Sequence, residues 1–274
     1  MKKQNENAPR GAVTVGDYSS LIFGPIHSRR LGTSLGIDLT PHKHCSLNCI
    51  YCECGSTTHL EITRQEYFPV EWVLTKIENF FQSLSPSLPP IDFVTFSGNG
   101  EPTLYSKIGT VIKFLKQNYP QYQLALITNG TLLADRLLQQ DLLELDLIIP
   151  TLNAVTPTIF TKINRPSPEL SIENVLQGIT DFSLIFGGKI WIEIFVVPGL
   201  NDNEEEFTKI KEYILNINKK AGMQKISKIQ LNSIDRPGSE KWISPPSENK
   251  LKQLQQSLLP LSAEIIPSKY LRGI

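Results

Sequence analysis

The sequence predicts an α/β fold in which helices cover a mainly parallel sheet. Short apolar segments rich in β-branched residues alternate along the chain with segments whose apolar residues have helical spacing. Several strand segments are apolar at consecutive positions, as expected for a parallel sheet buried on both faces. The chain has 274 residues, 40% of them hydrophobic, which is enough to bury a core of this kind.

The elements follow one another from a polar N-terminal stretch, residues 1–20, which we expect to be a flexible arm. The predicted strands are 34–39, 91–96, 123–128, 146–152, 189–197 and 228–234. The predicted helices are 69–84, 105–118, 132–143, 171–185, 203–217 and 247–259. Asp202 and Ser247 are predicted to cap the last two helices, because their short polar side chains can accept from free amides of the first turn.

Strands that are each followed by a helix imply parallel pairing through right-handed crossovers. Such a chain can form a partial (β/α)6 barrel of the TIM type or a doubly wound sheet, and both place the active site at the carboxyl ends of the strands. We expect a core domain over residues 21–245, with residues 246–274 supplying a C-terminal helix and a strand or tail packed on it.

Composition narrows the function. The chain has 27 basic residues (Lys and Arg) and 27 acidic residues (Asp and Glu), so its net charge is zero. This balance excludes the class of proteins that bind nucleic acid mainly through a large positive charge. No apolar run reaches the roughly 18–20 residues that cross a bilayer, and the N-terminus lacks the apolar segment of a secretory signal. We therefore expect a cytoplasmic protein without a membrane partner.

The cysteines are the most informative residues. All four lie within one short segment after the first predicted strand: Cys45, Cys49, Cys52 and Cys54. Clustered cysteines favour a metal site in a reducing compartment over a set of disulfides. In the pattern C-x3-C-x2-C, three thiolates could hold three irons of a [4Fe–4S] cluster and leave the fourth iron open to a substrate or cofactor.

Other interpretations of this segment remain open. A zinc site could be completed by nearby histidines, which are His42, His44 and His59. The cysteines could also pack without a metal. Cys54 could be a fourth ligand or a small residue packed in the loop.

The cysteine segment, with Tyr51 before its third cysteine, resembles the radical S-adenosylmethionine (SAM) superfamily. The resemblance implies the partial (β/α)6 barrel, a [4Fe–4S] cluster on Cys45, Cys49 and Cys52, and SAM bound to the open iron. It also implies that the reduced cluster cleaves SAM to methionine and a 5′-deoxyadenosyl radical, which abstracts hydrogen from a substrate. A flavodoxin or ferredoxin is the implied electron donor.

The other strand ends extend the resemblance. The segment S-G-N-G-E-P resembles the superfamily's G-G-E-P, whose backbone and acid meet the SAM amino group, and T-N-G and T-L-N-A resemble its next two strand-end turns. The implied cofactor-binding residues are Tyr51, Gly98, Asn99, Gly100, Glu101, Thr128, Asn129, Thr151 and Asn153. Glu193, a carboxylate in an apolar strand, needs a partner or a ligand, so it is either a paired structural acid or a further SAM contact.

Charged and polar residues before the first predicted strand and after later strands are candidates for the substrate site. They are Arg29, Arg30, Arg165, Asn232, Asp235 and Arg236. Arg165, in the segment I-N-R-P, could meet the SAM carboxylate or a substrate anion. The alternative for each charged residue is a structural ion pair or an exposed position.

A narrower resemblance suggests a substrate. The segments F-G-P-I-H-S-R-R-L-G, I-N-R-P and Q-L-N-S-I-D-R-P resemble the group related to the wyosine tRNA-base synthases, which implies a tRNA base. No cysteine precedes Cys45 or follows Cys54, so the second cluster of true wyosine synthases is not expected. Two alternatives are a peptide- or protein-modifying enzyme, including a glycyl-radical activase, and a non-catalytic iron–sulfur or zinc binding module.

Overall fold

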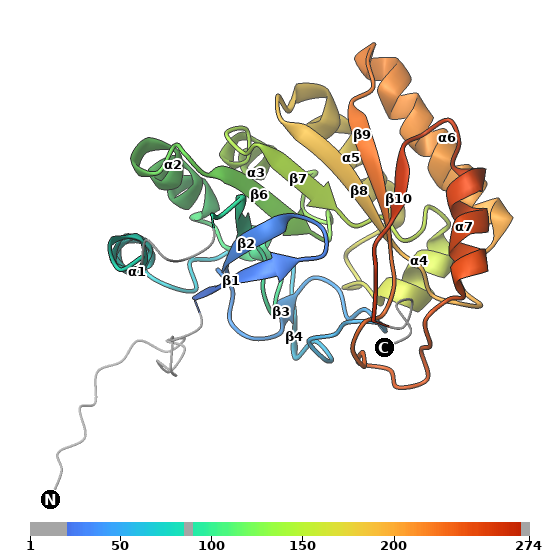
Figure 1. Cartoon of the computed structure of the whole chain (residues 1–274), viewed down its shortest axis with the longest axis horizontal. Coiled ribbons are helices and arrows are strands. Elements are labelled where there is room, and N and C mark those ends of the chain that lie inside the picture. The colour runs from blue at the N-terminus through green and yellow to red at the C-terminus, as the bar shows by residue number, and fades with distance from the viewer. Residues whose placement is uncertain (1–20, 85–89, 270–274) are drawn as a thin grey trace, which may run out of the picture.

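The computed structural model describes residues 21–84 and 90–269 (Figure 1). The predicted arm, 1–20, and the end of the predicted C-terminal segment, 270–274, lie outside the described residues. The main strands are β1 (Ile22–Ser28), β2 (Gly32–Ile37), β5 (Phe93–Phe96), β6 (Gln123–Thr128), β7 (Leu147–Pro150), β8 (Lys189–Phe195), β9 (Ile226–Asn232) and β10 (Ala263–Ile265). The helices are α1 (Val70–Gln82), the 3-10 turn η1 (Pro102–Leu104), α2 (Ile108–Asn118), α3 (Arg136–Asp141), α4 (Pro157–Asn164), α5 (Ile172–Ile185), α6 (Glu204–Ala221) and α7 (Glu248–Ser257).

These strands form one eight-stranded sheet in the order β1-β2-β5-β6-β7-β8-β9-β10. β1 is antiparallel to β2, and every later pairing is parallel. Figure 1 shows the longer helices ranged around the outside of the curved sheet, from α1 and α2 to α6 and α7. Two-residue strands β3 (His44–Cys45) and β4 (His59–Leu60) pair separately, in the loop between β2 and α1.

The predicted α/β fold is confirmed. Each predicted strand corresponds to one of β2 and β5 to β9, and each predicted helix to one of α1, α2, α3, α5, α6 and α7. The sheet closes no ring of hydrogen bonds among the described residues, since β1 and β10 remain its edges. None of the described helices has the length and hydropathy that are needed to cross a membrane.

The two longest elements that were not predicted are β1 and α4. β1 contains a Gly-Pro pair and lies at the sheet edge, where a missing amide is tolerated and no regular alternation of apolar residues is required. α4 has eight residues and only a short apolar stripe, in which Phe160 and Ile163 are buried. Both elements are too short or too irregular for periodicity to reveal them.

One of the two predicted helix caps is wrong. Ser247 caps α7, accepting a hydrogen bond from the Lys250 amide. The cap of α6 is Asn203, which accepts from the Glu206 amide, and not Asp202. Asp202 instead accepts from the Gly199 amide at 2.7 Å, because it closes the turn that precedes the helix.

Alternation along the strands separates the core from the interior of the curved sheet. In β5, Val94 and Phe96 are buried in the hydrophobic core between sheet and helices. Thr95 lies between them on the other face and bonds Ser34 of β2 through the hydroxyls, at 2.7 Å. The inner face is therefore free to carry polar groups, since the outer face supplies the core.

Candidate active site

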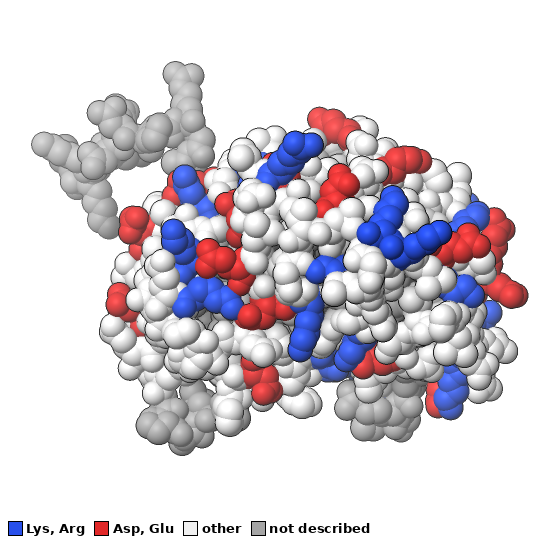
Figure 2. Space-filling model, turned by 90° about the horizontal axis from the view of Figure 1, so that it is seen from above, with Lys and Arg blue, Asp and Glu red and all other residues white. Residues whose placement is uncertain are grey.

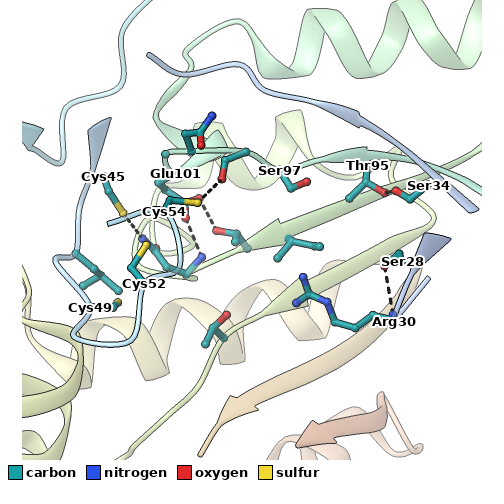
Figure 3. A pocket seen from close by; sticks show the side chains of 18 of the residues that line it. Ser28, Arg30, Ser34, Cys45, Cys49, Cys52, Cys54, Thr95, Ser97 and Glu101 are labelled. Atoms are coloured by element: carbon teal, nitrogen blue, oxygen red, sulfur yellow. Dashed lines mark hydrogen bonds between the residues drawn. The ribbon is translucent and has the colours of Figure 1, made fainter. Parts of the chain in front are cut away.

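A cavity of about 590 Å³ lies on the inner side of the sheet. Its volume is within the range of small-molecule sites. Figure 3 shows the cysteines at one end, and Arg30 with the Ser34–Thr95 pair at the other. The lining residues that the sequence singled out are Arg30, Cys45, Cys49, Tyr51, Cys52, Cys54, Gly98, Asn99, Gly100, Glu101, Thr128, Asn129, Thr151 and Arg236.

The cysteine loop is held by main-chain hydrogen bonds from two distant segments. The Ile50 amide donates to the Ile163 carbonyl at 3.0 Å, and the Asn48 amide donates to the Asn164 carbonyl at 3.0 Å. On its other side the Ile50 carbonyl accepts from the Glu240 amide at 2.9 Å. The end of α4 and the loop after β9 therefore fix a segment that has almost no regular structure of its own.

The thiols have unequal environments. Burial raises the pKa of Cys45 well above its usual range and raises the pKa of Cys49 to about 12. A hydrogen bond with Cys54, assisted by the nearby Lys43 ammonium, lowers the pKa of Cys52. Lys43 is itself buried, and its Nζ donates to Cys52 Sγ at 3.2 Å.

Gly100 lets the strand-end turn after β5 approach the cysteine loop. A Cβ at this position would lie 2.4 Å from the His44 carbonyl oxygen and 2.5 Å from Thr40 Oγ1. The next residue, Glu101, donates its amide to the same His44 carbonyl at 2.9 Å. Glycine is thus required by a close approach of two loops, both of which line the cavity.

The Glu101 carboxylate is buried and fully oriented. Its Oε1 accepts from the Thr103 and Thr128 hydroxyls, both at 2.6 Å, and from the Thr103 amide. Its Oε2 accepts from the Asn129 amide at 2.8 Å. Burial raises the pKa of Glu101, and these hydrogen bonds oppose the rise because they favour the charged form.

Asp38 is a buried carboxylate that the sequence did not single out as a site residue. Its Oδ2 accepts from the Asn99 amide at 2.9 Å and from Asn99 Nδ2 at 3.0 Å. A Cβ on Gly98 would lie 2.0 Å from its carboxyl carbon. The available signal was an acid inside the apolar predicted strand 34–39, because a buried carboxylate needs partners. The contacts of Asp38 show that it shapes the turn at Gly98 and Asn99.

Asn153 and Glu193 are buried beside the cavity without lining it. Asn153 donates to the Tyr51 hydroxyl at 2.7 Å, and the Tyr51 ring stacks on Phe195 with centroids 4.0 Å apart. Glu193 pairs with Arg30 at 2.6 Å and accepts from Asn232 at 2.6 Å. Glu193 is thus paired with Arg30 and Asn232 in the structure, and its contact with SAM stays a prediction.

The remaining substrate candidates form ion pairs at or beyond the cavity rim. Arg236 lines the cavity and pairs with Glu53 at 3.0 Å. Arg29 lies 3.8 Å from Asp235, and neither lines the cavity. Arg165 is 45% exposed and pairs with Glu240 at 2.7 Å, so the structure does not bring it to the cavity.

Comparison with known proteins identifies the family. Residues 39–210 match the radical SAM superfamily. The chain belongs to this superfamily. Its members use a [4Fe–4S] cluster and SAM and need a reductant, so this radical SAM chain binds iron, sulfide and SAM.

The radical SAM chain is similar to curated proteins of diverse length. A UPF0026 protein of Helicobacter pylori strain J99 is 34% identical over 222 residues, which are 81% of this chain and 68% of that protein. A protein of Brachyspira hyodysenteriae named GTPase Obg is 38% identical over 189 residues, which are 69% of this chain and 27% of that protein. This chain therefore spans only about a quarter of the Brachyspira relative.

Solved structures show the same fold. A structure of TYW1 with a lysine-pyruvate adduct bound superposes with a TM-score of 0.57 at 18% identity, covering 85% of this chain and 75% of that chain. A likeness at this identity shows the radical SAM fold alone.

The donor set fits an iron–sulfur cluster. Three sulfurs of the C-x3-C-x2-C segment face one cavity, and burial makes two of the free thiols poor acids, which binding to iron would offset. No three His, Cys, Asp or Glu side chains within residues 21–84 and 90–269 converge on a single ion. A cube differs in this respect, because each cysteine binds a different iron.

Proposed function

We propose that this chain is an enzyme that generates a radical from SAM and uses it to abstract hydrogen from a substrate. One observation carries the proposal: Cys45, Cys49 and Cys52 face the same cavity as the oriented carboxylate of Glu101. Cys45, Cys49 and Cys52 would hold the [4Fe–4S] cluster, which in its reduced form would supply the electron for cleaving SAM to methionine and a 5′-deoxyadenosyl radical. Residues 21–245 form the catalytic core of this proposal, and a flavodoxin or ferredoxin is the proposed reductant.

The chain's own residues bind and orient SAM. Among the described residues, Glu101 Oε2 accepts from the Asn129 amide, and this oxygen has capacity to accept from the SAM amino group as well. Four lining residues would contact the cofactor with it: Gly100, Thr128, Asn129 and Thr151. Asn153 acts through Tyr51, whose ring it holds against Phe195 at the cavity wall.

Substrate binds, in this proposal, at the end of the cavity opposite the cysteines. That end is lined by Arg30 and by the hydroxyl groups of Ser28, Ser34 and Thr95. Arg30 is already paired with Glu193, so it offers its remaining N–H donors rather than an uncompensated charge. Such a wall favours a neutral, hydroxyl- or amide-bearing group next to the radical carbon.

Two classes of substrate are proposed, a tRNA base and a peptide or protein. On the described part of the face in Figure 2, Lys and Arg are interspersed with Asp and Glu. This face has no continuous basic field of the kind that binds a phosphate backbone. This face therefore gives no support to the tRNA class, and the peptide or protein class does not depend on such a field.

The test is production of 5′-deoxyadenosine by protein reconstituted anaerobically with iron and sulfide, reduced with dithionite and given SAM. We expect product from wild-type protein and none from Cys45→Ala, Cys49→Ala or Cys52→Ala. The matched variant Cys54→Ala is expected to retain its cluster, because Cys54 lies outside the C-x3-C-x2-C pattern.

Bulk tRNA and peptide or protein fractions are then added separately, and stimulation of SAM cleavage by one of them identifies the substrate class. Absence of 5′-deoxyadenosine from fully loaded protein in all these mixtures would contradict the proposal and favour a binding module.

A further inference from the structure

Each cysteine of the C-x3-C-x2-C segment receives a hydrogen bond from a side-chain nitrogen. The three contacts are Asn129 Nδ2 to Cys45 Sγ at 3.5 Å, Asn164 Nδ2 to Cys49 Sγ at 3.3 Å and Lys43 Nζ to Cys52 Sγ at 3.2 Å. The donors come from the end of β6, the end of α4 and the cysteine loop itself. The fold therefore brings one donor to each sulfur from three separate segments.

The ammonium group of Lys43 is buried next to the Cys52 sulfur. It is only 3% exposed, and a buried ammonium needs an anionic partner. Within the described residues, the hydrogen bond recorded for its Nζ goes to the Cys52 sulfur. A thiolate bound to iron supplies the negative charge that this site requires.

Asn164 is similarly placed. It is 4% exposed, and its Oδ1 has no hydrogen-bond partner among the described residues. Buried amides normally form hydrogen bonds through both their oxygen and their nitrogen. Because the Asn164 oxygen has none within the described part of the chain, we infer that the contact of Nδ2 with the Cys49 sulfur positions this side chain. Asn129 has a second role, because its Oδ1 also accepts from the Thr131 amide and hydroxyl.

We propose that Lys43, Asn129 and Asn164 set the reduction potential of the cluster. This proposal rests on the proposed function, which places the cluster on the three cysteines. Reduction adds one electron from the external reductant and increases the negative charge on the sulfurs. Donors to these sulfurs stabilise the reduced cluster more than the oxidised one and so raise its potential. No bond in the protein is made or broken.

The test is a redox titration of the cluster-loaded protein without SAM, followed by electron paramagnetic resonance. At a fixed ambient potential, Lys43→Met is expected to lower the ratio of reduced to oxidised cluster by about tenfold, which is about 59 mV for a one-electron couple. Asn164→Leu is expected to lower this ratio by about threefold, since it removes a dipole rather than a charge.

The matched variants separate tuning from loss of structure. Lys43→Arg keeps the charge and the donors and should titrate close to wild type. Lys113→Met and Asn174→Leu change exposed residues of the same types and should not shift the potential. The proposal is overturned if Lys43→Met and Asn164→Leu, with full iron and sulfide content, titrate with the wild type.

A second measurement uses wild-type protein and does not depend on the variants loading a cluster. Protein labelled with 15N only in lysine Nζ, or only in asparagine Nδ2, should show 15N hyperfine coupling to the reduced cluster in pulsed paramagnetic resonance. Absence of coupling in both samples would overturn the proposal. Failure of SAM cleavage with shifted potentials would instead contradict the proposed function alone.

Discussion

The ion pair between Arg30 and Glu193 permits a worked prediction. Glu193 is 7% exposed and Arg30 is 23% exposed, at a separation of 2.6 Å. Removing one partner of a buried pair costs about 3–5 kcal/mol, because the other charge remains desolvated. For Arg30→Met we expect the lower end, about 3 kcal/mol, since Asn232 still donates to Glu193 and the arginine was partly solvated.

Changing the other partner, Glu193, should lower the free energy of unfolding by less. Glu193→Gln keeps an oxygen that accepts from Asn232, and it leaves Arg30 where water can reach the guanidinium, so we expect a loss of about 1–2 kcal/mol. The double variant Arg30→Met/Glu193→Gln removes both charges. It should be no less stable than Arg30→Met alone, which corresponds to a coupling energy of about 1–2 kcal/mol.

The assay is thermal unfolding of the four proteins in the same metal-free, anaerobic buffer. At about 2–4 °C per kcal/mol, Arg30→Met should lower the melting temperature by about 6–12 °C. Lys252→Met is the control, because the Lys252–Glu248 pair is more than half exposed and screened by water, so its loss should leave the melting temperature close to that of wild type. Losses that add within about 0.5 kcal/mol in the double variant would refute the reasoning, since independent sites behave in that way.

Three further predictions follow from single contacts. Gly100→Ala should reduce iron and sulfide loading on reconstitution. Its Cβ would lie 2.4 Å from the His44 carbonyl oxygen and displace the strand-end turn from the cysteine loop. Loading equal to that of wild type would contradict this prediction. In metal-free protein, iodoacetamide at pH 7 should modify Cys52 before Cys45. The lowered pKa of Cys52 makes it a thiolate at a pH where an ordinary thiol is mostly protonated, whereas the pKa of Cys45 is raised. Mass spectrometry of the digest reports the order, and earlier modification of Cys45 would contradict the prediction. Asn203→Ala should cost about 1 kcal/mol in thermal unfolding, as the loss of a helix cap does, and an unchanged melting temperature would show that the cap is dispensable.

Much of the fold was predictable because its signals are local and repeated. Helices such as α1 and α2 bury regular apolar stripes, and β6 is apolar over consecutive residues. β1 was missed because its Gly-Pro pair interrupts the pattern at a sheet edge, where pairing with β2 decides the conformation. The cap of α6 was misplaced by one residue, because Asp202 and Asn203 are both good caps and only the preceding turn distinguishes them.

Within the site, the residues at strand ends were predictable and the ion pairs were not. Carboxyl ends of parallel strands meet at one edge, which is why Glu101, Thr128 and Thr151 share a cavity. The orientation of Arg165 depends on its left-handed backbone, with φ of 44°, and on Glu240, which is far away in the sequence. Neither is visible in the segment I-N-R-P.

The segment I-N-R-P also orients the cysteine loop. Spacing determines which thiols can share a cluster, but a loop with only the two-residue strand β3 cannot by itself orient them. The orientation comes from main-chain bonds of Ile163 and Asn164 to the loop, and from the amide of Asn164 at the Cys49 sulfur. Arg165 is the conspicuous side chain of the segment I-N-R-P, yet the main chain and Asn164 make the contacts with the cysteine loop. Main-chain contacts do not depend on side-chain type, so the sequence does not reveal them. The residue types of the segment therefore point to Arg165, although other atoms of the same segment make the contacts.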